Sequence, residues 1–287
     1  PMSTYDMVAQ VERAFRTLQS GLNFGKIVVR IRVQPCGELG GSHIVTGGTA
    51  GLGLLTGRWL SQRGVASLTL ASRSGRLASD MNAELDMLHA TATALSVAAA
   101  NTGEDADVHK LVAGACVPSI DGVWHSAGVL ADALLPQLDQ HLLNRSFAPK
   151  VHGAWALQLA CATTPLGSFV LFSSVASLLG GAGQTNYSSA NSCLDALSRY
   201  RRELAQVAVS VQWNAWAEIG MAARGAAAAR MLAMEKKTGF GRIGLAQGLA
   251  ALEMATHAEG PSVLGVCPMV WSRVLGGEAK VPAFLTN

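Results

Sequence analysis

Two hydroxyl-bearing residues stand thirteen positions apart in a stretch suited to proton transfer. Ser174 follows an apolar run at 169–172 that predicts a buried strand, and Tyr187 opens a segment with helical character. Three glycines lie between 180 and 183, which suits a loop that turns tightly. A strand end, a glycine loop and a helix start can bring the two side chains face to face. Because a phenol beside a hydroxyl can donate a proton, this stretch predicts a reductase that protonates a reduced carbonyl.

Lys150 is the candidate for a cation beside that phenol. A free phenol has a pKa of about 10, and a neighbouring ammonium would lower it. Lys150 lies in a largely apolar segment, within a helix predicted over 138–161. It follows Pro149, which cannot donate the helical hydrogen bond and should distort the backbone there. A solvated lysine on an exposed helix face is the alternative, and the segment alone does not decide between them.

A glycine-rich turn, TGGTAGLG at 46–53, joins a predicted strand at 43–46 to a predicted helix at 51–63. Backbone amides in such a turn can approach a pyrophosphate, and the amino end of the helix favours its negative charge. An ordinary tight turn between strand and helix would use the same glycines. The strand before the turn and the helix after it favour a dinucleotide site.

The next predicted strand, 67–71, runs into Ser72, Arg73 and Ser74. A site that selects NAD usually places an acid here, for the ribose 2′-hydroxyl. An arginine between two serines suits a 2′-phosphate instead, which predicts NADPH as the cofactor. A solvated surface arginine is the alternative. Asn101 could likewise reach the adenine edge, or simply form part of a turn.

Strand and helix patterns alternate from residue 42 onwards. Strands are predicted at 43–46, 67–71, 95–100, 122–126, 168–174, 207–213 and 262–266. Helices are predicted at 51–63, 80–91, 104–116, 138–161, 187–205 and 244–257. This alternation predicts an α/β fold, a Rossmann-like doubly wound parallel sheet covered on both faces. Ligands bind such sheets at the carboxyl ends of the strands, where the residues discussed above fall.

The chain divides into three parts on these patterns. Residues 1–33 form a small unit with a helical pattern at 8–18 and a predicted strand at 26–31. Segment 34–41 contains glycines and a proline and is predicted to be a linker, and 42–287 is the predicted catalytic domain. Because the chain starts with proline rather than methionine, we expect it to be a piece of something larger.

Composition excludes several classes of function. The chain is 49% hydrophobic and 14% charged, which provides for a large core. A net charge of +3 without a basic, aromatic-containing run argues against nucleic acid as a partner. The five cysteines include no Cys-x-x-Cys pair, which argues against a metal site or a disulfide scaffold and suits a reducing compartment. With neither a signal peptide nor a long apolar run, we expect a soluble cytoplasmic protein without a membrane partner.

Seven motifs resemble those of the ketoreductase domain of modular, type I polyketide synthases, a branch of the short-chain dehydrogenase/reductase family. They are TGGTAGLG (46–53), ASRSG (71–75), HSAGV (125–129), APKVHGAW (148–155), SSVAS (173–177), YSSAN (187–191) and WNAWAEIGM (213–221). The resemblance spans nearly all of 42–287. It implies the NADPH-dependent reduction of a β-ketoacyl group on an acyl carrier protein to the β-hydroxyacyl group, in polyketide or fatty acid biosynthesis.

The resemblance also implies roles for four residues. Tyr187 would be the general acid, and Ser174 would orient the carbonyl. In the wider family a lysine follows the tyrosine by four residues, where this chain has Asn191. The polyketide synthase branch resembles an exchanged version, which Lys150 and Asn191 fit. Lys150 would lower the phenol pKa and hold the nicotinamide ribose, and Asn191 would help to hold the proton-relay geometry.

Cofactor contacts are predicted along the strand ends. The residues predicted to bind NADPH are Gly47, Thr49, Ala50, Gly51, Leu52, Gly53, Ser72, Arg73, Ser74, Asn101, Thr102, Ser126, Ala127, Gly128, Lys150, Tyr187, Asn214 and Trp216. Of these, the small segment 126–128 could pass under the cofactor or form an ordinary turn. At 214–216, backbone groups are expected to meet the nicotinamide amide.

Substrate orientation is predicted to depend on Asp132, Leu179, Asn186 and Met221. Asp132 matches the last acid of the Leu-Asp-Asp motif that this family associates with D-hydroxyl products. Leu179 stands where the opposite class carries tryptophan, and Asn186 also fits the D class. Alanines at 131 and 182 depart from the pattern of that class. We expect the D-hydroxyl (B-type) product. Met221 could line the acyl channel or only pack in a helix.

The start of the chain resembles a different domain. VERAFRTLQSGLNFGKIVV (11–29) is similar to the last helix and strand of the enoyl reductase domain that precedes the ketoreductase in fully reducing modules. Two other functions remain open: a stand-alone short-chain dehydrogenase of a free alcohol or ketone, and a non-catalytic scaffold domain. The enoyl-reductase-like tail argues against the first, and the retained glycine turn and Tyr187 argue against the second.

Overall fold

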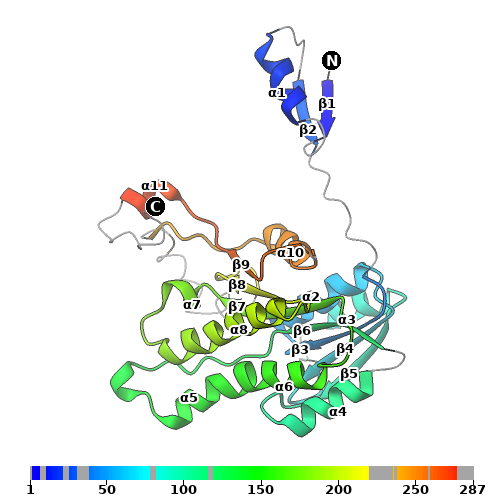
Figure 1. The fold of residues 1–287 in the computed structure, drawn as a ribbon, viewed down its shortest axis with the longest axis vertical. Helices are drawn as coiled ribbons and strands as arrows, with labels where there is room; N and C mark the ends of the chain where they lie inside the picture. Colours follow the sequence, from blue (N-terminus) through cyan, green and yellow to red (C-terminus); the bar gives the residue numbers. More distant parts are fainter. Residues whose placement is uncertain are drawn as a thin grey trace. The chain divides into compact units, whose positions relative to one another are not determined.

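The computed structural model describes residues 2–6, 11–21, 26–30, 39–77, 82–115, 119–219, 235, 238–257 and 259–276. The chain divides into two compact units, Pro1–Gly37 and Glu38–Asn287 (Figure 1). In the first unit, β1 (Met2–Asp6) pairs in parallel with β2 (Lys26–Arg30), and α1 (Val11–Gln19) connects the two strands in the chain order. The helical and strand patterns of this unit are found, but β1 was not predicted. Most of the predicted linker lies outside the described residues.

The second unit is built on one parallel sheet of seven strands, as predicted. Its strands are β3 (Ser42–Thr46), β4 (Ser67–Ser72), β5 (Ala94–Ala99), β6 (Ile120–His125), β7 (Ser168–Ser174), β8 (Val209–Trp213) and β9 (Val263–Val266). They lie in the order β5-β4-β3-β6-β7-β8-β9. The chain builds outwards from β3 to one side and then from β6 to the other. This reversal opens a crevice at the carboxyl ends of β3 and β6, the usual ligand position in such sheets.

Helices cover both faces of the sheet (Figure 1). On one face are α2 (Gly51–Gln62), α3 (Asn82–His89) and α10 (Leu245–Met254), and on the other α4 (Asp105–Ala115), α6 (Gly153–Ala160) and α8 (Thr185–Glu203). Successive strand residues point to opposite faces, so Val45 packs in the first layer and Ile44 in the second. Two short helices were not predicted, α7 (Ala176–Leu179) and α11 (Trp271–Gly276).

The predicted single helix over 138–161 is wrong in one respect that bears on the site. It consists of α5 (Gln140–Phe147), a π-helical turn η2 (Ala148–His152) and then α6. The expected distortion at Pro149 is therefore present, and it takes the form of a wider turn because proline cannot donate the usual backbone bond. Lys150 lies in the middle of that turn.

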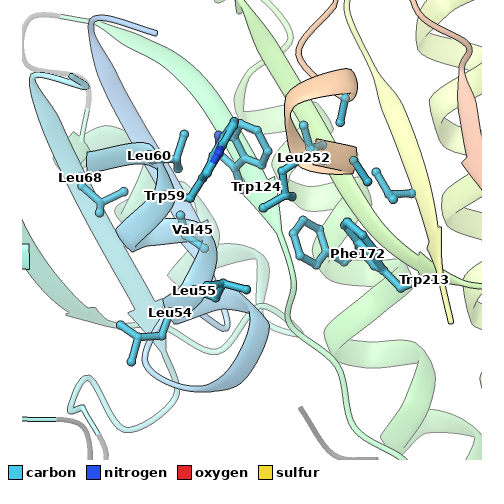
Figure 2. Packing of buried hydrophobic residues seen from close by; sticks show 14 of the residues in the cluster. Val45, Leu54, Leu55, Trp59, Leu60, Leu68, Trp124, Phe172, Trp213 and Leu252 are labelled. Atoms are coloured by element: carbon cyan, nitrogen blue, oxygen red, sulfur yellow. The ribbon is translucent and has the colours of Figure 1, made fainter. Parts of the chain in front are cut away.

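Aromatic side chains fill the layer between the sheet and helices α2 and α10 (Figure 2). Trp59 and Trp124 meet edge to face with ring centroids 5.7 Å apart. Phe172 and Trp213 follow at 5.6 Å, and Trp213 contacts Trp216 at 5.2 Å. These contacts tie β6, β7 and β8 to the covering helices, which keeps the carboxyl ends of the strands in fixed relative positions.

Substitution of Gly248 in α10 tests the packing of this aromatic layer. A methyl group there would collide with the indole ring of Trp216. We expect Gly248→Ala to lower the free energy of unfolding by about 1–3 kcal/mol, as overpacked cores do. The matched control is Gly114→Ala in α4, where a methyl group would meet no atom within 4 Å. That change should stabilise the chain by up to about 1 kcal/mol, because alanine favours helix. Urea denaturation measures both, and equal effects would contradict the packing described.

Candidate functional site

The predicted site residues follow the carboxyl ends of the strands. Those within the described ranges come after β3 (47–53), β4 (72–74), β5 (101–102), β6 (126–128) and β8 (214 and 216), with Ser174 at the end of β7. Lys150, Tyr187 and Asn191 come from η2 and α8. Met221 lies outside the described residues.

The glycine turn after β3 has the geometry of a phosphate cradle. Gly47 adopts a φ of +66°, and a methyl group there would lie 2.9 Å from the backbone nitrogen of Ala127. Gly53 would collide with the carbonyl of Gly47 if it carried a side chain. Ala50, the N-cap of α2, provides no side-chain cap to the first helical amides. Small residues and uncapped amides at a helix start fit a pyrophosphate.

The end of β4 presents an exposed cation. Arg73 is exposed between Ser72 and Ser74, whose hydroxyl oxygens lie 3.3 Å apart. The Ser72 hydroxyl also accepts a bond from the amide of Gly75 at 3.2 Å, which shapes the turn. A guanidinium flanked by hydroxyl groups fits the 2′-phosphate that distinguishes NADPH from NADH.

Two residues predicted to contact the cofactor have structural partners instead. Thr102 is buried, and its hydroxyl donates to the carbonyl of Pro149 at 3.1 Å. The side-chain oxygen of Asn101 accepts from the amide of Gly103 at 3.2 Å. Thr102 therefore anchors the π-helical turn, and Asn101 shapes the loop after β5.

Lys150 is buried, with 4% of its surface exposed. Its Nζ donates to the carbonyl of Phe172 at 2.8 Å and lies 5.4 Å from the ring centroid of Tyr187. A methyl group at Gly128 would come within 2.9 Å of the lysine Cε, so glycine leaves room for this side chain. Burial lowers the pKa of Lys150 to about 8, and the negative charge of Asp195 opposes that shift.

His125 fixes the backbone of Lys150, a role the sequence analysis missed. Its Nε2 lies 3.0 Å from the carbonyl oxygen of Lys150, which can only accept, so Nε2 carries the proton. Its Nδ1 then accepts from the hydroxyl of Thr46 at 2.7 Å. Burial lowers the pKa of His125 to about 4, which keeps the ring neutral near pH 7. A histidine ending an apolar strand beside the site was the signal that could have revealed this.

Tyr187 contacts Ser174, which the spacing predicted to lie opposite it, and Asn191, which the family resemblance implied. Burial raises the pKa of the Tyr187 phenol, while hydrogen bonds with the side chains of Asn191 and Ser174 lower it. The charge of Asp132 adds to the upward shift. The net direction is opposite to the lowering expected from Lys150, because burial of the phenol outweighs the other effects. Asn191 Nδ2 also donates to the backbone carbonyl of Tyr187 at 2.8 Å.

The glycine loop before Tyr187 is bonded to the loop after β6. The amide of Ala133 donates to the carbonyl of Gly183 at 2.8 Å. The side chain of Gln184 donates to the exposed carboxylate of Asp132 at 3.2 Å. Leu179 lies half-buried at the end of α7. Asp132 is thus held next to the glycine loop that precedes Tyr187.

Asn186 stabilises the loop after β6 through hydrogen bonds of its buried side chain. It is 1% exposed, and its Nδ2 lies within 2.8–3.1 Å of the carbonyls of Ala131 and Leu142 and of the hydroxyl of Ser146. Because its amide is committed to these oxygens, any influence of Asn186 on a substrate acts through the loop around 131.

The segment after β8 packs its side chains inwards. Asn214 Nδ2 donates to the carbonyl of Gly241 at 2.8 Å. Trp216 is buried between Trp213 and Gly248. The side chains of Asn214 and Trp216 are thus engaged within the protein, and contact of the backbone of 214–216 with a nicotinamide stays a prediction.

The part of the chain that the structure describes contains neither a metal cluster nor a membrane-spanning helix. Within it, no group of three or more histidine, cysteine, aspartate or glutamate side chains could hold a metal ion. Among its helices, none is long and apolar enough to cross a bilayer. Of the cysteines, Cys161, Cys193 and Cys267 form no disulfide, and Cys36 and Cys116 lie outside the described residues.

Comparison with known proteins agrees with this arrangement. The family model described as "KR domain" matches residues 41–218. The chain is 37% identical over 264 residues to polyketide synthase GfsB of Streptomyces halstedii, covering 90% of this chain and 5% of that protein. It is 38% identical over 267 residues to the spectinabilin polyketide synthase system protein NorB of Streptomyces orinoci, covering 90% of this chain and 12% of that protein. The chain thus spans only a small part of these relatives.

Solved structures give the same result for the fold. An A-type ketoreductase from a modular polyketide synthase superposes with a TM-score of 0.76 at 32% identity, covering 83% of this chain and 49% of that chain. The ketoreductase from the first module of phoslactomycin biosynthesis in Streptomyces sp. HK803 superposes with a TM-score of 0.75 at 32% identity, covering 82% and 55%. With the family model matching more than half of its length, the chain belongs to the ketoreductase domains of modular polyketide synthases, which are oxidoreductases of Rossmann-like fold.

Proposed function

We propose that this chain reduces a β-ketoacyl group carried on an acyl carrier protein to the β-hydroxyacyl group, with NADPH as the reductant. The observation that carries the proposal is the buried ammonium of Lys150 over the ring of Tyr187, with Ser174 beside the phenol. This group lies at the same edge of the sheet as the glycine turn. Bound NADPH would supply the hydride that reduces the carbonyl carbon.

The residues of the chain then handle the oxygen. The Ser174 hydroxyl oxygen accepts from the amide of Ala176 at 3.2 Å, which fixes this side chain beside Tyr187, where its hydroxyl would orient the substrate carbonyl. As the carbon gains hydride, the oxygen becomes an alkoxide, and Tyr187 donates its phenolic proton to it. The raised pKa keeps Tyr187 protonated until that step. The nearby ammonium of Lys150 stabilises the tyrosinate that forms, and it would hold the nicotinamide ribose when NADPH binds.

The same proposal covers product handedness and partners. Asp132, which accepts from Gln184, and Leu179 support the D-hydroxyl product through their resemblance to the pattern of that class. Residues 42–287 form the proposed catalytic domain, 34–41 a linker, and 1–33 the tail of an upstream enoyl reductase. The polyketide synthase relatives support neighbouring domains of this kind, with an acyl carrier protein delivering the thioester.

The hydroxyl of Tyr187 is the most direct test of this chemistry. We expect Tyr187→Phe to lower kcat for a β-ketoacyl thioester by about 10²–10⁴-fold, the contribution of general acid catalysis. Saturable NADPH binding should persist, since the ring remains. Tyr200→Phe is the matched control, because Tyr200 lies exposed on the same helix. The absorbance of NADPH measures turnover. A folded wild-type chain without turnover, or a Tyr187→Phe variant equal to it, would contradict the proposal.

Arg73 tests the choice of cofactor. Removing a charged hydrogen bond to a phosphate costs roughly 10- to 100-fold in affinity. Arg73→Ala should therefore raise KM for NADPH by that factor and leave KM for NADH almost unchanged. Arg76→Ala, another exposed arginine three residues away, is the control and should alter neither constant. If both substitutions raise KM for NADPH equally, the assignment of Arg73 to the 2′-phosphate is wrong.

A further inference from the structure

Helix α8 carries a buried carboxylate behind the catalytic residues. Asp195 is 4% exposed. It follows Asn191 by four residues and Tyr187 by eight, so the three residues lie along one face of the helix. Measured along the helix axis, its backbone position lies about 6 Å from that of Asn191 and about 12 Å from that of Tyr187. Its Oδ1 accepts from the hydroxyl of Ser210 at 2.6 Å. Its Oδ2 accepts from Gln212 Nε2 at 2.8 Å and lies 2.8 Å from the hydroxyl of Ser177. Neither the motifs nor the mechanism above uses Asp195.

The hydrogen-bond partners of the Asp195 carboxylate do not neutralise its negative charge. Ser177, Ser210 and Gln212 are neutral groups, which orient the carboxylate without cancelling its negative charge. The positive charge of Lys150 is buried in the same way, because its ammonium donates to a neutral group, the carbonyl of Phe172. The charge of Asp195 favours the ammonium form of Lys150 against the effect of burial. Asp195 and Lys150 are thus both buried, and the hydrogen bonds of each are made with neutral groups.

Other titratable groups near Lys150 do not supply this charge. His125 on β6 is neutral near pH 7, and His152 on η2 is exposed. Tyr187 on α8 is a protonated phenol, and the exposed Asp132 acts on that phenol. Strands β7 and β8 and helix α7, which surround the pair, contain no ionisable residue.

Asp195 is also linked to Ser174. The hydroxyl of Ser177 lies 2.8 Å from Asp195 Oδ2 and 2.8 Å from the carbonyl of Ser174, and Gln212 Nε2 donates to it at 2.9 Å. Ser177 stands in the first turn of α7, the short helix that begins directly after Ser174. The carboxylate and β8 therefore brace the segment that presents the catalytic hydroxyl.

We propose that Asp195 is a positioning residue of the reductase site. Its carboxylate fixes Ser177 and thereby the segment that carries Ser174, and its buried negative charge stabilises the buried ammonium of Lys150. This role rests on the proposed function for its meaning in catalysis. The contacts that carry it can be tested without turnover.

The test uses the full 287-residue chain, with ¹³C-labelled lysine ε-carbons followed by NMR through a pH titration. The Lys150 signal is assigned with Lys150→Arg. In Asp195→Asn, which keeps the shape and removes the charge, the titration midpoint of Lys150 should fall by about one pH unit or more. Glu253→Gln is the matched control, since Glu253 is a buried carboxylate on α10 that pairs with Arg63 on the opposite face of the sheet. It should leave the midpoint unchanged.

Turnover measurements then separate the two parts of the role. In Asp195→Asn, the pH above which kcat declines should move down together with the midpoint of Lys150. Ser177→Ala keeps the charge and removes the link to Ser174, so kcat should fall roughly 3- to 10-fold with the midpoint unchanged. Asp195→Glu, which restores the charge, should return the midpoint towards that of the wild type.

Three results would overturn the role. They are an unchanged Lys150 midpoint in folded Asp195→Asn, an equal fall in the Glu253→Gln control, and an unchanged kcat in Ser177→Ala. The Ser177→Ala result decides the positioning of Ser174 even if Asp195→Asn does not fold. A wild-type chain that shows no reduction of β-ketoacyl thioesters would contradict the proposed function instead, while the NMR titration would still decide whether Asp195 holds the charge on Lys150.

Discussion

A buried ammonium constrains the catalytic part of this chain. Removing a charge from water is costly unless the protein supplies hydrogen bonds and opposite charge, and the surroundings of Lys150 do both. The carbonyl of Phe172 accepts from the ammonium, and His125 and Thr102 hold the carbonyls of the turn that presents it. Gly128 leaves space for the side chain. The π-helical turn, the small loop after β6 and the neutral histidine are therefore parts of one arrangement that keeps a cation beside Tyr187.

Much of this arrangement could be predicted from the sequence. Apolar runs alternating with helical patterns predicted the parallel sheet, since its inner strands β3, β6, β7 and β8 are buried on both faces. The carboxyl ends of those strands then located the site, because the topology of such sheets brings them to one edge. The resemblance to ketoreductases addressed what the patterns left open: it implies that Asn191 stands where the wider family has lysine and that Lys150 is the exchanged lysine. Pro149 correctly signalled a disturbed helix.

The remaining features depend on tertiary contacts that no local pattern encodes. The hydrogen bonds of Asn186 and Thr102 are made to carbonyls that segments distant in the sequence contribute. His125 and Asp195 looked like ordinary polar residues, and only their partners on η2 and β8 reveal what they hold. The direction of the pKa shift of Tyr187 was misjudged for the same reason, because the burial of the phenol depends on how α8 packs.

The central claim is that this site transfers hydride to a β-carbonyl carbon while Tyr187 supplies the proton. Incubating the wild-type chain with a β-ketoacyl thioester and NADPH carrying deuterium at both hydrogens of nicotinamide C4 tests it directly, with the product analysed by mass spectrometry and NMR. The account predicts one deuterium on the β-carbon of a single β-hydroxyacyl enantiomer, and none on the new hydroxyl after exchange with water. Consumption of the cofactor with deuterium elsewhere, or a product without deuterium, would contradict it.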